Sequence, residues 1–100
     1  MERYLTEVPA MPVTIEKLND AEIRGRGIRN WPVWEKEVST FPWFYDSPEM
    51  CLFLEGEVVV TDKDTGKRYE IRKGDFVTFP ADMACTWEVR KPVKKHYRFE

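Results

Sequence analysis

The chain has 100 residues, of which 16 are basic and 18 acidic, so its formal net charge is −2. This length predicts one domain with a single core, and the charge excludes a general electrostatic attraction to nucleic acid or anionic lipid. The two cysteines, Cys51 and Cys85, form no CxxC motif, which excludes a zinc ribbon or a scaffold of several disulfides.

The composition also bears on location and on ligands. No apolar run is long enough to cross a membrane, and residues 1–12 lack the apolar segment of a signal peptide. We therefore expect a cytoplasmic protein with no membrane or nucleic-acid partner. Aromatic residues make up 14% of the chain, and this content predicts large buried contacts or a ligand-binding surface.

Residues 1–30 are expected to form an arm that packs on the main domain. Two prolines make residues 1–12 irregular or a first edge strand. Between 14 and 23, a short helix capped by Thr14 competes with a strand through Val13, Ile15 and Lys17. The following turn or loop carries a basic cluster, which either contacts a partner or is simply solvated. The cluster consists of Arg24, Arg26 and Arg29.

From residue 31 onward the pattern is typical of short β-strands. Strands are predicted at 33–39, 43–46, 49–54, 57–61, 68–72, 76–79, 85–90 and 93–99. In the first of these strands Trp34 and Val38 share one face, and residues 40–42 interrupt the pattern before Trp43. Turns are predicted at 64–67, 73–75 and 81–83. Residues 31–100 therefore predict an all-β sandwich or small barrel.

One stretch, from 43 to 56, suggests where a site lies. On strand alternation Trp43, Tyr45, Glu49, Cys51 and Phe53 share one face. The opposite face between 50 and 54 is also apolar, so both faces are expected to be buried. A carboxyl group on such a strand either lines a cavity or is paired with another polar group.

Two motifs in this part of the chain resemble those of the cupin superfamily. Glu49 precedes Gly56 by the spacing that ends the first cupin motif, and residues 74–80 match the Gly-Asp start and the proline of the second. Residues 31–38 and 78–80 look most like single-domain proteins related to the cupin domain of (S)-ureidoglycine aminohydrolase. The resemblance implies a cupin-type jelly-roll β-barrel and a homodimer.

The metal ligands of this superfamily are mostly missing from the chain. Trp43, Tyr45 and Cys85 occupy the positions where the resemblance places histidines, and only Glu49 remains. An indole has no usable lone pair, so we expect no metal and no other cofactor. The only histidine, His96, is predicted to point outward from the last strand.

Several interpretations of these residues stay open. Glu49, Cys51 and Cys85 either hold a soft metal or are two buried thiols beside a carboxyl group. Glu49 either transfers protons or is held by Tyr45 or by an arginine, and Cys85 lacks a histidine that would activate it as a nucleophile. The aromatic residues, Trp34 among them, either line a cavity or fill the core.

The leading prediction is a metal-independent cupin that binds a small molecule. Its predicted ligand-binding residues are Trp43, Tyr45, Glu49, Cys51, Cys85 and Trp87. One alternative is a small enzyme, an aminohydrolase or isomerase, with Glu49 as its catalytic residue. The other is an interaction module of a larger complex that makes contact through the basic cluster.

Overall fold

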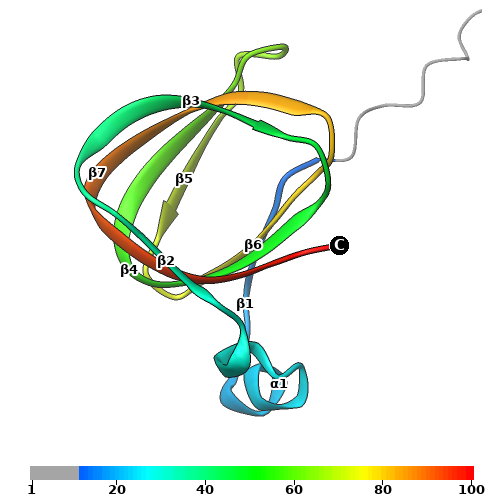
Figure 1. The fold of residues 1–100 in the computed structure, drawn as a ribbon. Coiled ribbons are helices and arrows are strands. Elements are labelled where there is room, and N and C mark those ends of the chain that lie inside the picture. The colour runs from blue at the N-terminus through cyan, green and yellow to red at the C-terminus, as the bar shows by residue number, and fades with distance from the viewer. Residues whose placement is uncertain (1–11) are drawn as a thin grey trace, which may run out of the picture.

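The computed structural model describes residues 12–100, which form one curled antiparallel sheet with two short helical segments outside it (Figure 1). The elements are β1 (Thr14–Lys17), α1 (Asp20–Gly25), the 3-10 helix η1 (Ile28–Asn30), β2 (Val33–Lys36), β3 (Ser39–Tyr45), β4 (Glu49–Asp62), β5 (Arg68–Arg72), β6 (Asp75–Phe79) and β7 (Met83–Phe99). In this part of the chain no helix is long and apolar enough to cross a membrane.

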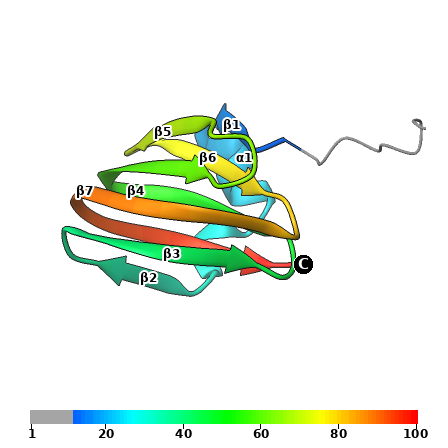
Figure 2. The same cartoon turned by 90° about the horizontal axis from the view of Figure 1, so that it is seen from above.

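Two long strands organise the sheet. β4 pairs with β7 along most of its length, and the strand order is β1-β6-β4-β7-β2, with β5 also on β4 and β3 also on β7. Figure 2 shows β2 and β3 at one edge of the sheet and β5 and β1 at the other. Because β4 and β7 are strongly bent, the sheet closes on itself around a core. The predicted all-β jelly-roll barrel is thereby confirmed.

Gly56 allows the two long strands to bend together. It has a φ of +105°, and a Cβ placed there would lie 2.4 Å from the carbonyl oxygen of Pro92. The register between β4 and β7 shifts on both sides of this glycine, as in a series of β-bulges. The predicted break at Gly56 is therefore a bend inside one strand, β4.

The core has two parts, one on each face of β4. The barrel interior holds the larger cluster, including Phe53, Phe79 and Trp87. A smaller cluster outside the barrel is centred on Ile28 and Leu52. It contains side chains from α1 and η1, so these two helical segments pack on the outer surface of the sheet. Burial of both faces of residues 50–54 agrees with the sequence-based expectation.

The structure of the N-terminal part of the described chain differs from the sequence-based prediction. Residues 14–17 form a strand paired with β6, in agreement with the predicted strand through Ile15 and Lys17. A helix also follows this strand. That helix is capped by Asn19 and not by Thr14, and it continues through Gly25, where a turn was predicted. The expectation of an irregular arm or edge strand at residues 1–12 falls almost entirely outside the described residues.

A second correction concerns β3. The predicted interruption at 40–42 is wrong, because β3 runs from Ser39 through Pro42 to Tyr45. Proline is tolerated here since β3 lies at the edge of the sheet and its partner is β7. The real break falls just before β3, where Val38 is 60% exposed and does not share the buried face of Trp34.

Candidate functional site

A cavity of about 190 Å³ opens into the barrel between β2, β3, β4 and β7. Its walls are almost entirely aromatic, and its charged groups are one carboxylate and one ammonium. The lining residues are Trp34, Phe41, Trp43, Glu49, Trp87, Lys95, Tyr97 and Phe99. Alternation along β3 and β7 brings these side chains inward, because Phe41 and Trp43 share one face of β3 while Trp87, Lys95, Tyr97 and Phe99 share one face of β7.

The polar end of the cavity is a buried ion pair. The ammonium of Lys95 donates a hydrogen bond to Oε2 of Glu49 over 3.1 Å, and both side chains are only 5% exposed. Aromatic rings surround the same ammonium, with centroids 4.8 Å away for Trp87, 5.0 Å for Trp34 and 5.8 Å for Phe53. The faces of aromatic rings attract a cation. The Glu49 carboxylate and the rings together therefore stabilise the buried charge of Lys95.

The second partner of the Lys95 ammonium is Cys51. The ammonium lies 3.2 Å from Cys51 Sγ. Burial raises the pKa of the Cys51 thiol to about 12, although the nearby ammonium acts in the opposite direction. Burial likewise raises the pKa of Cys85 to about 11. Both thiols are therefore protonated at neutral pH, which makes them poor metal ligands and poor nucleophiles.

Tyr45 belongs to the packed core behind the cavity. Its ring stacks on Phe79 with centroids 4.7 Å apart, and its hydroxyl accepts a hydrogen bond of 3.2 Å from Nε1 of Trp87. Burial, and next the negative charge of Glu49, raises the pKa of Tyr45 well above its ordinary value. The idea that Tyr45 or an arginine holds Glu49 is wrong, because the partner of Glu49 is Lys95.

The donor atoms around Glu49 do not fit a cupin metal centre. Trp43 and Cys85 face each other across β3 and β7, and neither offers an imidazole nitrogen. Within residues 12–100 no cluster of three or more His, Cys, Asp or Glu side chains has the geometry to hold a metal ion. In addition, a cation beside Glu49 would meet the positive charge of Lys95 at short range.

Three of the six predicted ligand-binding residues line the cavity, and three lie behind it. Trp43, Glu49 and Trp87 are part of the wall. Tyr45, Cys51 and Cys85 are buried in the surrounding core. Whether any of the six binds a ligand stays a prediction.

Sequence reasoning missed Lys95, the cation of the site. Strand alternation contained the necessary signal, because Lys95 stands between Val93 and Tyr97 on the inward side of the last strand. A lysine at such a position requires a buried anion, and Glu49 was the carboxylate already expected to be buried. Phe41, Tyr97 and Phe99 were also not assigned to the site.

His96 is less exposed than predicted. It lies on the opposite side of β7 from Lys95, but it is half-buried, and its Nδ1 lies 3.0 Å from the carbonyl oxygen of Trp31. The histidine thus links β7 to the segment that follows η1. It does not line the cavity.

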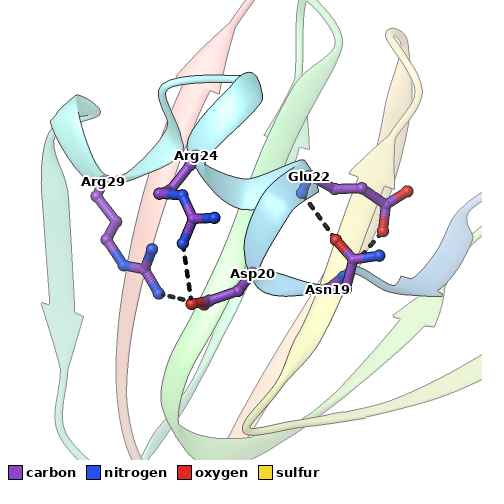
Figure 3. Close-up of polar contacts among 5 residues, drawn as sticks. All are labelled: Asn19, Asp20, Glu22, Arg24 and Arg29. Atoms are coloured by element: carbon purple, nitrogen blue, oxygen red, sulfur yellow. Dashed lines mark hydrogen bonds and ion pairs between the residues drawn. The ribbon is translucent and has the colours of Figure 1, made fainter.

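The basic cluster is partly neutralised within the chain. Asp20 accepts hydrogen bonds from Arg24 at 3.3 Å and Arg29 at 3.0 Å, while Asn19 and Glu22 form the capping box of α1 (Figure 3). The hydrogen bond and charge of Arg29 lower the pKa of Asp20. These two arginines have a local structural role, which weakens the interpretation of the cluster as an interaction surface.

Comparisons with known proteins agree with the fold. A DUF861 family protein from Thermotoga maritima is 49% identical, with a TM-score of 0.86, over 89% of this chain and 100% of that chain. The Clostridium difficile EutQ protein is 16% identical, with a TM-score of 0.61, over 87% of this chain and 66% of that one. A DUF861 family protein from Pseudomonas syringae pv. tomato is 23% identical, with a TM-score of 0.60, over 68% of this chain and 29% of that one.

The last two similarities, at these low identities, concern the fold alone. No curated protein matches the chain. The EutQ-like cupin domain matches residues 24–97, which include every residue of the cavity wall except Phe99. The chain therefore belongs to the family of EutQ-like cupin domains.

Proposed function

We propose that this cupin binds a small molecule in the aromatic cavity, without a metal ion. The observation that carries the proposal is the buried carboxylate of Glu49, which lines the cavity and is 4% exposed. Its Oε2 atom accepts a hydrogen bond from Lys95, and the Cys51 thiol also donates to this carboxylate. An ionised carboxylate offers about four lone-pair sites, so Glu49 can accept a further hydrogen bond from a ligand in the cavity.

The size and walls of the cavity define a ligand class. An apolar cavity of about 150 Å³ is known to accommodate benzene, and this one measures about 190 Å³. The space suits one planar ring with a small substituent. Phe41 and Trp87 offer nearly parallel rings, inclined at 23°, against which a planar ligand can pack. We therefore expect a single-ring compound with an N–H or O–H group directed at Glu49.

Metal independence is supported by the charge already present. The Lys95 ammonium lies 3.1 Å from Glu49 and occupies the side of the carboxylate where a cation would otherwise bind. Elemental analysis of the purified protein is expected to find no stoichiometric transition metal. About one metal ion per chain, lost in Glu49→Gln, would contradict this part of the proposal.

An enzyme using the same residues is the second candidate. Glu49 and Lys95 form a pair that can exchange a proton inside a cavity. An aminohydrolase or isomerase needs such a proton-transfer group beside its substrate. The resemblance to the cupin domain of (S)-ureidoglycine aminohydrolase points to the same class. Turnover of a bound ligand, abolished in Glu49→Gln with binding retained, would favour this candidate.

Binding is tested by a thermal-shift screen with single-ring phenols, anilines and amides. A ligand present at about 100 times its Kd should stabilise the protein by about 2.7 kcal/mol. The stabilisation should disappear in Glu49→Gln and weaken in Trp43→Ala, whose side chain is 43% exposed and contributes little to the core. Glu57→Gln, at an exposed carboxylate, is the matched control. A ligand that stabilises all variants equally would place the binding site elsewhere.

We also propose that the protein is a cytoplasmic homodimer formed through the β2–β3 edge. Val33, Val38 and Phe44 are 45%, 60% and 55% exposed along this edge. An open edge with apolar side chains favours pairing with another strand. Light scattering after gel filtration should give the dimer mass, and Phe44→Lys should give the monomer mass. A monomer in the parent protein would contradict the dimer.

A further inference from the structure

The position of Lys95 suggests a covalent reaction in the same cavity. We infer that the Lys95 amine forms a reversible imine with a small aldehyde or ketone bound there. The inference rests on the proposed function, because the carbonyl compound must first occupy the aromatic cavity. It goes beyond that function by naming the reacting atom and the chemical class of the ligand.

The first requirement is a nucleophile that a ligand can reach in a dry environment. Lys95 lines the cavity, while its side chain is only 5% exposed to solvent. The lining contains one amine and no thiol, since both cysteines lie in the core behind it. A lysine amine that is removed from water is the group that proteins use for imine formation with carbonyl substrates.

The second requirement is a proton acceptor beside the nucleophile. The Lys95 ammonium donates to Glu49 Oε2 over 3.1 Å, so a proton can pass directly between the two groups. Transfer gives a neutral amine and a neutral carboxylic acid, which removes two opposite charges from a poorly solvated site at once. The amine then has the lone pair that attack requires.

The steps balance with these two residues alone. The nitrogen lone pair forms a bond to the carbonyl carbon, and the carboxylic acid of Glu49 gives its proton to the carbonyl oxygen. Glu49 then removes a proton from nitrogen and returns it to the new hydroxyl group, which leaves as water. The net change converts an ammonium and a carbonyl compound into a protonated imine and one water molecule, with no oxidant or reductant.

The surroundings suit the product as well as they suit the free lysine. The protonated imine keeps one positive charge at the same nitrogen, so it still pairs with the carboxylate of Glu49. The rings of Trp87, Trp34 and Phe53, at 4.8 to 5.8 Å, favour a cation at this position whether it is an ammonium or an iminium. The apolar walls limit the access of water that would hydrolyse the product.

Reductive trapping tests the inference. Benzaldehyde matches the size expected for the cavity, and sodium cyanoborohydride converts its imine into a stable benzylamine. Intact mass should rise by one benzyl group, and peptide mapping should place that group on Lys95. Without the reductant, the adduct should be lost on dialysis. Because the labelled lysine is identified in the parent protein, this test does not depend on whether a variant folds.

Variants separate the site from general lysine chemistry. Lys95→Arg keeps the positive charge and should lose the single label, whereas Lys91→Arg should keep it. Lys91 is the matched control, because it pairs with Glu57 over the same 3.1 Å but its side chain is 67% exposed. Glu49→Gln should slow the labelling, since it removes the proton acceptor.

Three outcomes distinguish a failure of the inference from a failure of the proposed function. Label spread over exposed lysines, with Lys95 unmodified in the folded protein, would overturn the inference. If phenol still stabilises the parent protein in a Glu49-dependent manner, the proposed binding function survives that result. If neither phenol nor benzaldehyde occupies the cavity, both fail together.

Discussion

Replacing Lys95 with methionine removes the cation of the buried pair but keeps a side chain of similar length. Between unit charges 3.1 Å apart, the attraction is about 5 kcal/mol at an effective dielectric constant of about 20. The cost of removing both charges from water offsets much of this energy. Because either single substitution leaves a buried charge without its partner, we expect Lys95→Met or Glu49→Gln to cost about 3–5 kcal/mol of unfolding free energy.

The double variant distinguishes the ion pair from general packing. Glu49→Gln combined with Lys95→Met removes both charges, so its loss of stability should be smaller than the sum of the two single losses. We expect a coupling energy of about 3 kcal/mol. The measurement is urea-induced unfolding at pH 7, followed by circular dichroism for the parent protein and the three variants.

The exposed pair of Glu57 and Lys91 is the control for this cycle. Its nitrogen–oxygen distance is also 3.1 Å, but its side chains are 67% exposed for Lys91 and 45% for Glu57. A cycle of Glu57→Gln and Lys91→Met should give a coupling of less than about 1 kcal/mol. If the buried cycle is additive, or no larger than the exposed one, the reasoning about burial is refuted.

Three further predictions concern the core and the backbone. Burial raises the pKa values of Cys51 and Cys85 to about 12 and about 11, so their contribution to stability is present below pH 9 and is lost as pH rises toward these values. The unfolding free energy should therefore fall between pH 9 and 11. A thiol reagent at pH 8 should react much faster with the protein in urea than with the native protein. A fast reaction with the native protein would contradict this prediction. Gly56→Ala should lower the unfolding free energy measured in urea by about 2 kcal/mol or more, because its Cβ would lie 2.4 Å from a carbonyl oxygen. At Gly25 a Cβ meets nothing within 4 Å, so Gly25→Ala should be neutral or stabilising. Equal effects of the two substitutions would contradict the strain at Gly56. Tyr45→Phe should cost about 1–3 kcal/mol, since a buried indole N–H loses its acceptor; an unchanged unfolding midpoint would show that the indole finds another partner.

Several features of this protein were determined by the sequence itself. Alternation along β7 put Cys85, Trp87 and Val89 on the inward face, and all three are buried. The turns before β5 and β6 contain Gly66 and Gly74, both with positive φ. These features depend only on residues that are neighbours in the sequence, so they can be predicted without knowledge of the fold. The absence of histidines at the metal positions was equally visible.

The tertiary structure alone decided how the inward side chains meet. Alternation assigns a face, but it does not tell how deep a side chain lies along the barrel axis. Tyr45 and Trp43 share a face, yet Tyr45 is 1% exposed in the core and Trp43 is 43% exposed at the cavity. The edge position of β3 likewise let the strand continue through Pro42, which the local pattern marked as a break.

The pairing of Glu49 with Lys95 is the clearest case. The two residues lie 46 positions apart in sequence, on β4 and β7. Each alone is a charged residue at an inward position, and only the register between the two strands brings their atoms together. Alternation marks each side chain as inward but does not give that register, because the bends and bulges of both strands shift it. The carboxylate of the site was therefore found from the sequence. Alternation also marks Lys95 as inward, but its contact with Glu49, and with it the chemistry proposed for the cavity, required the folded barrel.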